Sequence, residues 1–346
     1  MEKKRRWKTK QRLEEEEEEE EKRVGSASAV AKALFQCANL ILPWLQPSDI
    51  ASISSTCKTL NLISRSITSL RSSDASRSFE NFPIPFVNSV DHHPYAYFLY
   101  TPSQLIASPS LRQPWGPISN PRTRPDSLRP NLSDLVLSQF GCHCECCVEA
   151  ECPCWNGESV ELITECGPSC GCGLQCGNRL TRRGVSIRLK IVRVWRKDWG
   201  LFADEPIPIG QFVCEYAGEV LTTPEARRRQ IMYDKLVLEG HFSSALLVVR
   251  EHLPSGKACL RINIDATRIG NVARFINHSC DGGNLLTKVV RIAGALLPRL
   301  CFFASKNIEK DEELSFSYGD TRLKPNGLPC FCGSSCCSGT LPSENT

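Results

Sequence analysis

The sequence predicts a mainly β domain with small helices, flanked by cysteine-rich metal-binding segments and preceded by a small helical segment. Three observations point to this class. The second half contains short runs rich in β-branched and aromatic residues, such as RLKIVRV, QFVCEYAGEVL, RINID and LCFFASKNI. One long helical pattern, PEARRRQIMYDKLVLEG, interrupts these runs. Most of the 20 cysteines lie in two tight clusters, one on each side of the β-rich region.

Composition limits the compartment and the partners. A chain of 346 residues can bury one large core or two medium ones, and its net charge of +4 says little about partners. No apolar stretch follows the basic start MEKKRRWKTKQR, and no uninterrupted apolar run reaches the about 18 residues of a membrane helix. We therefore expect no membrane partner and an intracellular protein, in which clustered thiols favour zinc.

Three segments precede the first cysteine cluster. Residues 1–29 join a basic run to eight consecutive glutamates, which predicts a disordered charged tail. The basic run is either a nuclear localisation signal or a solvated charge run. Residues 30–70 show apolar residues at helical spacing and weakly resemble an F-box, so they either bind an adaptor protein or pack as a helical element. Residues 71–138 are rich in Ser, Pro and Arg and predict a linker or an irregular wrap.

The first cysteine cluster, in residues 140–184, has two halves with the spacings C-x-C-x2-C-x4-C-x-C and C-x3-C-x-C-x3-C. Nine thiolates can surround three zinc ions if three sulfurs bridge two metals, because three tetrahedral ions need about twelve ligand positions. Disulfides are the alternative, but the neighbours Cys146 and Cys147 are awkward to pair. The predicted ligands are Cys142, Cys144, Cys147, Cys152, Cys154, Cys166, Cys170, Cys172 and Cys176.

This nine-cysteine pattern resembles the pre-SET region of SET-domain histone-lysine methyltransferases, of the suppressor-of-variegation-related type found in plants. The resemblance continues through KDWG (197–200), CEYAGE (214–219), ARFINHSC (273–280) and EELSFSYGD (312–320). It ends with the post-SET spacing C-x-C-x4-C. The implied regions are pre-SET (140–184), SET (186–320) and post-SET (326–342). The implied fold is the SET fold, in which two of these motifs meet in a pseudoknot.

The family resemblance assigns roles to individual residues. It implies that S-adenosylmethionine, the methyl donor, is bound by Lys197, Asp198, Trp199, Arg274, Asn277 and His278. It implies a lysine channel and catalytic site made by Tyr318, Tyr216 and Phe316. Core packing is the ordinary alternative for each tyrosine. A phenylalanine at position 316 leaves room for di- or trimethyl-lysine as product.

The C-terminal cysteines Cys330, Cys332 and Cys337 reproduce the post-SET spacing, and Cys336 is the spare. Three thiolates leave a tetrahedral zinc one ligand short. The resemblance takes the fourth ligand from the cysteine that ends ARFINHSC, which is Cys280. We therefore expect a fourth zinc ion in this site.

Several positions depart from the family pattern. Asp198 stands where a glycine is usual, and Ser317 replaces an aspartate between Phe316 and Tyr318. The stretch after Cys280 reads DGGN, with one extra residue and a more flexible backbone. The helical insert also lacks a tyrosine that many relatives place beside the donor. These changes concern donor affinity and the choice of target lysine more than the fold.

The resemblance implies a methyltransferase that uses S-adenosylmethionine and acts on histone tails, histone H3 above all, and on nucleosomes. It also implies a protein of the nucleus, associated with chromosomes, and the chain shows no recognisable sequence-specific DNA-binding module. The alternative is a non-catalytic chromatin or ubiquitin-ligase adaptor that retains the SET fold. A basic tail would favour an acidic groove, and the candidate acids, which fit a solvated surface equally well, are Glu309, Asp311, Glu312, Glu313 and Asp320.

Overall fold

The computed structural model describes residues 32–33, 35–106, 162–168, 170–173, 175–238, 243–252, 259–295, 297–319 and 327–342. Contacts divide the chain into a smaller unit, residues 1–69 with 113–119, and a larger unit, residues 70–112 with 120–346. Within the described parts, no helix is both long and apolar enough to cross a lipid bilayer.

The smaller unit is helical where it is described. A 3-10 turn, η1 (Leu42–Trp44), precedes helix α2 (Pro47–Ser54), and α3 (Lys58–Ser73) starts in this unit. Its small apolar core contains Ala38, Leu42, Ile50 and Ile67. The proline at the start of α2 suits the first helical turn, where a backbone N–H has no helical partner.

The larger unit is built mainly of strands, as the sequence predicts. Its described short helical segments are η4 (Gly177–Arg183) and η5 (Val272–Phe275), and the long helix among its described residues is α4 (Thr223–Leu238). Its strands are β1 (Phe86–Val87), β2 (Leu99–Tyr100), β3 (Leu105–Ile106), β4 (Leu162–Glu165), β5 (Leu189–Val194), β6 (Asp198–Ala203), β7 (Phe212–Glu215), β8 (Gly218–Leu221), β9 (Leu246–His252), β10 (Cys259–Gly270), β11 (Asn277–His278), β12 (Leu285–Ile292), β13 (Arg299–Ala304) and β14 (Ser315–Phe316).

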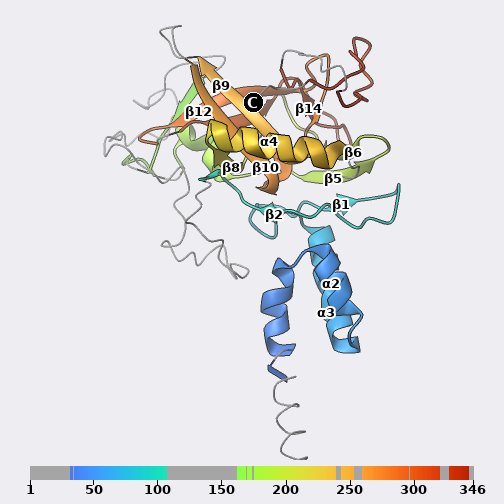
Figure 1. The fold of residues 1–346 in the computed structure, drawn as a ribbon. Coiled ribbons are helices and arrows are strands. Elements are labelled where there is room, and N and C mark those ends of the chain that lie inside the picture. Colours follow the sequence, from blue (N-terminus) through green and yellow to red (C-terminus); the bar gives the residue numbers. More distant parts are fainter. Residues whose placement is uncertain are drawn as a thin grey trace, which may run out of the picture. The chain divides into compact units, whose positions relative to one another are not determined.

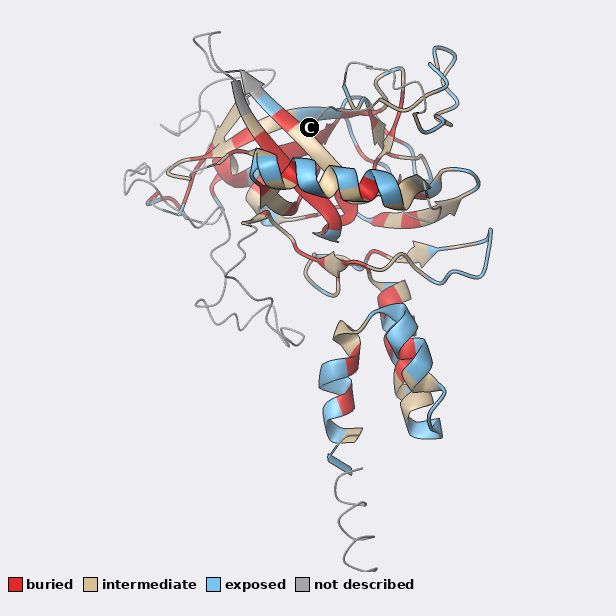
Figure 2. Ribbon diagram, viewed as in Figure 1, coloured by how far each residue is buried: buried red, intermediate tan, exposed pale blue. Residues whose placement is uncertain are grey.

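These strands form four small sheets. Their orders are β1-β5-β6, β2-β10-β8-β3 with β9 added on β10, β4-β12-β13-β7, and the pair β11-β14. The buried residues in Figure 2 concentrate in the strands of this unit. Most of them join one apolar core that includes Leu201, Val213, Ile264 and Phe302. Helix α4 contacts β10, and Figure 1 shows it lying across that strand.

Where it is described, the segment expected to be a linker or an irregular wrap packs onto the larger unit, as the second of these alternatives predicts, and it also adds short strands. Residues 86–106 supply β1, β2 and β3, which pair in parallel with β5, β10 and β8. Phe98 and Tyr100 of this segment are buried in the main core. Pairs of strand residues separated by prolines have no readable periodicity, so the sequence shows only an irregular segment here. This part of the chain is an integral layer of the domain, and residues 107–138 lie outside the described residues.

Candidate active site and cysteine clusters

The pairing of β11 with β14 brings the ARFINHSC and EELSFSYGD motifs together. Asn277 lies opposite Ser315 and His278 opposite Phe316 in a parallel register. Gly283 faces the same strand with a φ of +72°, and a Cβ there would lie 2.3 Å from the carbonyl oxygen of Ser315. The second glycine of the DGGN stretch, Gly283, is therefore required by the close approach of its backbone to Ser315.

On one side of this pair, the Glu313 carboxylate contacts Lys197 and Asn277, two residues predicted to bind the donor. Asn277 donates from Nδ2 to Glu313 Oε1 at 2.9 Å and to the carbonyl oxygen of Trp199 at 3.4 Å. Lys197 places Nζ 2.7 Å from Glu313 Oε2. The structure thus brings Lys197, Trp199 and Asn277 into one polar cluster, which we call the donor side.

Asp198 has a backbone conformation that glycine adopts more readily than other residues, which fits the glycine expected here from the family pattern. Its φ is +70°, in the left-handed region that aspartate tolerates better than most residues. Its carboxylate forms an ion pair with Arg193. Arg193 also lies 3.1 Å from the Asp91 carboxylate and places its guanidinium 5.3 Å from the centre of the Trp199 ring. The ion pair to Arg193 offers a reason for an aspartate at this strained turn.

His278 connects the donor side to the C-terminal cysteines. Its Nδ1 accepts from the backbone N–H of Tyr318 at 3.2 Å, and its Nε2 lies 3.2 Å from Cys280 Sγ. An accepting Nδ1 places the proton of the neutral ring on Nε2, which can then donate to the sulfur. Burial lowers the pKa of His278, which favours this neutral form.

The predicted lysine-channel residues line up as an aromatic wall. Ring centres are 5.0 Å apart for Phe316 and Tyr318, 4.8 Å for Phe302 and Phe316, and 6.4 Å for Tyr216 and Phe302. The Tyr318 hydroxyl donates to the carbonyl oxygen of Ile276 at 2.9 Å. Burial raises the pKa of Tyr216 and of Tyr318 well above the usual value, so both hydroxyls stay protonated.

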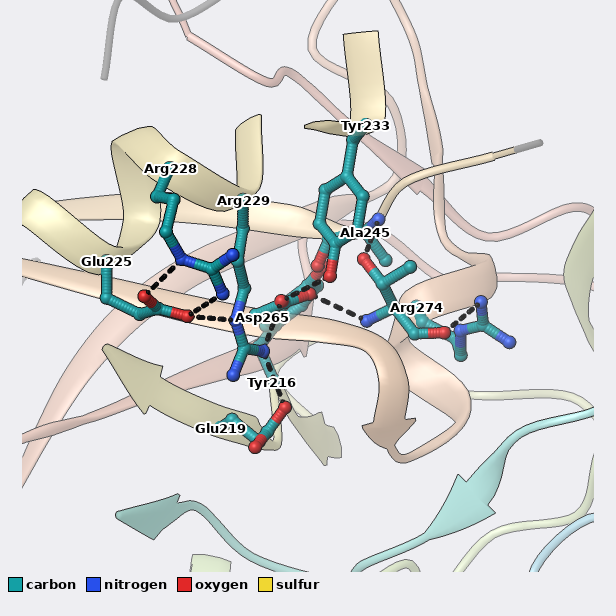
Figure 3. Close-up of polar contacts among 10 residues, drawn as sticks. Tyr216, Glu219, Glu225, Arg228, Arg229, Tyr233, Ala245, Asp265 and Arg274 are labelled. Carbon is teal, nitrogen blue, oxygen red and sulfur yellow. Dashed lines mark hydrogen bonds and ion pairs between the residues drawn. The ribbon is translucent and has the colours of Figure 1, made fainter. Parts of the chain in front are cut away.

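We call the aromatic wall and the residues around it the lysine side of the site. Arg274 lies on this side. Its Nη2 donates to the carbonyl oxygen of Thr267 at 3.1 Å, and its guanidinium stacks 4.9 Å from the ring centres of Phe98 and Phe275. Figure 3 shows this guanidinium in the polar network that includes Tyr216. Burial lowers the pKa of Arg274 to about 10. Its donor-binding role stays a prediction.

The C-terminal cysteines and the cysteine of ARFINHSC converge in space. The sulfurs of Cys280, Cys330, Cys332 and Cys337 all lie within 4.8 Å of one another, and those of Cys280 and Cys330 are 3.8 Å apart. A zinc tetrahedron with bonds of about 2.3 Å has edges of about 3.8 Å, so the donor set and spacing suit zinc. Burial raises the pKa of the Cys332 thiol, but backbone N–H groups and neighbouring sulfurs outweigh it and lower that pKa to about 6. The exposed Cys336 stands outside the group.

Part of the first cysteine cluster is described. The sulfurs of Cys166, Cys172 and Cys176 lie within 4.8 Å of one another. Arg179 donates to Cys172 Sγ from Nε and Nη2 at 3.3 and 3.2 Å, and Nη2 also reaches the carbonyl oxygens of Gly167 and Cys172. These cationic contacts suit a thiolate cluster. The predicted ligands that lie outside the described residues are Cys142, Cys144, Cys147, Cys152 and Cys154.

Comparisons with known proteins agree with this geometry. The family model "SET domain" matches residues 198–319. Histone-lysine N-methyltransferase SUVR3 of Arabidopsis thaliana is 57% identical over 97% of this chain and 100% of its own length. Arabidopsis thaliana SUVH6 in complex with SAM has a TM-score of 0.58 and 29% identity, covering 78% of this chain and 55% of the other. KRYPTONITE in complex with mCHH DNA, an H3(1-15) peptide and SAH has a TM-score of 0.55 and 28% identity, covering 78% of this chain and 53% of the other.

The chain belongs to the SET-domain family of histone-lysine N-methyltransferases.

The structure also shows a buried polar network that sequence reasoning missed. Asp265 is 1% exposed, and it accepts from Arg229 Nη1 at 2.7 Å and from the Tyr233 hydroxyl at 2.8 Å. This network adjoins Tyr216 in the SET domain (Figure 3). The carboxylate inside the β-rich run RINID could have indicated this network from the sequence, because a charge within a buried strand needs polar partners.

The carboxylates that were candidates for an acidic groove for a basic histone tail are mostly paired within the structure, which does not support such a groove. Asp311, Glu312 and Glu313 form ion pairs with Lys190, Lys306 and Lys197 of the SET-domain unit. These carboxylates already have internal cationic partners. The other two candidates are Glu309, which is exposed, and Asp320, which lies outside the described residues.

Proposed function

We propose that this chain transfers methyl groups from S-adenosylmethionine to a lysine of histone H3 in nuclear chromatin. The observation that supports this best is the position of Tyr318, whose ring lies between His278, next to the donor side, and Phe316 of the aromatic wall. Its ring centre lies 5.2 Å from that of His278 and 5.0 Å from that of Phe316. The related KRYPTONITE structure with an H3(1-15) peptide supports the choice of histone H3.

The donor side offers groups that fit the methyl donor. Lys197 supplies a cation and Asn277 an amide, which can bind carboxylate and hydroxyl groups, and Trp199 supplies a flat apolar ring. When bound, S-adenosylmethionine supplies an electrophilic methyl carbon whose bond to sulfur breaks as the bond to the lysine nitrogen forms. The roles of Lys197, Asp198, Trp199, Asn277 and His278 in holding it are part of this proposal.

The lysine side prepares the nucleophile. A lysine must be neutral to attack, and an apolar channel disfavours its charged form. Tyr216, Phe316 and Tyr318 would line this channel and exclude water. The Tyr318 proton is committed to the carbonyl oxygen of Ile276, so the hydroxyl oxygen keeps lone pairs that can accept from the amine. Orientation of the amine then supplies much of the rate increase.

We also propose that Phe316 permits more than one methyl transfer. Its ring packs between Phe302 and Tyr318, and it has no hydroxyl to hold a water in the channel. Di- or trimethyl-lysine should therefore form at long reaction times. Mass spectrometry that finds only monomethyl-lysine would exclude this.

Zinc completes the proposed site. The four converging sulfurs would hold one ion, and the nine predicted pre-SET cysteines would hold three. Closed sulfur sites leave no open coordination position, so we assign both clusters to folding stability.

Residues 30–70 are proposed to bind an adaptor protein. The described helices expose large apolar side chains, with Leu40 at 58% and Leu62 at 67% exposed. Removal of this segment should abolish adaptor capture and leave peptide methylation intact. Retained capture would assign the helices to packing alone.

The decisive experiment incubates the full chain with labelled donor and histone H3 peptides, core histones or nucleosomes. Tyr318→Phe should lower the rate by about 100-fold, because the acceptor oxygen at the amine is lost. Tyr95→Phe is the matched control, since it removes a hydroxyl that accepts from Arg71 away from the site. Failure of the unaltered chain to label any substrate would favour the adaptor alternative.

A further inference from the structure

The hydroxyl of Tyr216 is fixed by one backbone group. It donates to the carbonyl oxygen of Ala245 at 2.8 Å, and the backbone N–H of Ala266 donates to the same oxygen at 2.9 Å. The position of Ala245 therefore determines the position of the Tyr216 hydroxyl, and Tyr216 forms part of one wall of the proposed lysine channel.

Ala245 lies just beyond the end of a strand ladder. The pairing of β9 with β10 runs from Cys259 opposite His252 to Asp265 opposite Leu246. The N–H of Ala245 instead donates to the side-chain hydroxyl oxygen of Thr267, at 2.9 Å. One buried threonine hydroxyl thus anchors the chain segment that holds Tyr216.

Thr267 is in turn fixed from both sides. Its backbone N–H donates to Asp265 Oδ1 at 3.0 Å, and its carbonyl oxygen accepts from Arg274 Nη2 at 3.1 Å. The second oxygen of Asp265 accepts from Arg229 and from Tyr233 of helix α4. Figure 3 shows the contacts of Asp265 with Arg229 and Tyr233, close to Tyr216, Ala245 and Arg274.

We propose that Thr267 and Asp265 are positioning residues for the lysine channel. They connect helix α4 through Ala245 to the hydroxyl of Tyr216. This inference rests on the proposed role of Tyr216 in the channel. It predicts that the shape of the channel, and hence the rate and degree of methylation, depends on a hydroxyl that does not touch the substrate.

Thr267→Val tests this with little change in shape. Valine has nearly the same volume but leaves the Ala245 N–H without its acceptor, so the carbonyl oxygen that fixes the Tyr216 hydroxyl is held by the Ala266 N–H alone. We expect kcat to fall about tenfold, the proportion of mono-, di- and trimethyl product to shift, and the KM for the donor to stay within about twofold. Thr267→Ser keeps the hydroxyl and should stay within about twofold of the unaltered chain.

Thr101→Val is the matched control. Thr101 is equally buried, at 6% exposed, and its hydroxyl donates to the carbonyl oxygen of Ser103 at 2.7 Å in a turn outside this network. It should leave kcat and the product distribution unchanged. An equal loss in Thr101→Val, or in Thr267→Ser, would overturn the proposal.

Hydrogen exchange separates this inference from the proposed function. Thr267→Val should speed exchange of the Ala245 amide whether or not Tyr216 lines the channel. Unchanged exchange would overturn the positioning role. Faster exchange with normal kcat and products would leave the Ala245 anchor in place but overturn its link to the reaction. A Tyr216→Phe variant with normal kcat and products would then locate the failure in the proposed role of Tyr216.

Discussion

The two sides of the proposed site are held by different kinds of contact. On the donor side, half-exposed ion pairs fix the turn around Asp198: the Arg193 side chain is 20% exposed and that of Asp198 is 52% exposed. On the lysine side, Asp265 is 1% exposed and bonds to an Arg229 side chain that is 16% exposed. Exposed pairs contribute little and are screened by salt, whereas breaking a buried pair leaves an uncompensated charge. The donor side should therefore adapt more easily to change than the lysine side.

Among changes to the contacts that support the two sides, the largest effect should come from Cys280→Ser, which removes a predicted zinc ligand next to His278. Serine is a poor zinc ligand, so zinc content should fall by about one ion per chain and activity by at least about tenfold. Zinc content is measured by elemental analysis of the purified chain. Cys336→Ser is the control, because its sulfur lies outside the converging group. Unchanged zinc content in Cys280→Ser would show that Cys280 is not a ligand of the C-terminal site, and that this site is not linked to the donor side through Cys280.

The next effect tests the buried network. Asp265→Asn removes the most buried of the three carboxylates that pair with Arg229, the others being those of Glu219 and Glu225, and the free energy of unfolding should fall by about 2 kcal/mol. Urea unfolding measures this loss. Glu225→Gln is the matched control, since Glu225 also pairs with Arg229 but its side chain is 33% exposed. It should cost less than about 1 kcal/mol. Equal losses in the two variants would remove the distinction between buried and exposed contacts.

A smaller effect is expected from Asp91→Asn on the donor side. Asp91 pairs with Arg193, which holds Asp198 and stacks on Trp199. The KM for the donor should rise about threefold at low salt and match the unaltered chain at high salt. Asp204→Asn removes an ion pair with Lys190 on the same hairpin and should leave the KM unchanged. A rise that persists at high salt would show that the contact is not electrostatic.

The smallest effect should be that of Asp198→Gly. Glycine relieves the left-handed backbone but removes the ion pair to Arg193, and the two changes offset each other. The KM for the donor and the midpoint of unfolding should both stay close to those of the unaltered chain, with the KM within about twofold. A much lower KM for the donor in Asp198→Gly would show that the ion pair to Arg193 does not offset the backbone strain at Asp198.

Local sequence patterns and the family resemblance were sufficient for the fold class, and the roles of the individual site residues stay predictions. Strand-like runs and the α4 pattern can be recognised over a few residues, whereas Asn277, His278 and Tyr318 are singled out by the resemblance to the SET family. Such patterns depend on side-chain periodicity and capping, which act over a few residues. The sequence therefore determined a β-rich SET domain with its cysteine segments on either side.

Tertiary structure alone decided which distant groups meet. Strands β1, β2 and β3 are two residues long, and their parallel partners lie far along the chain, so no local period announces them. Asp265 becomes the centre of a network because α4 packs against β10. Cys280 meets cysteines some 50 residues away, a contact that the family resemblance predicted but that no local pattern could show. Contacts of this kind depend on the closure of long loops and on burial, and neither leaves a signal in a short stretch of sequence.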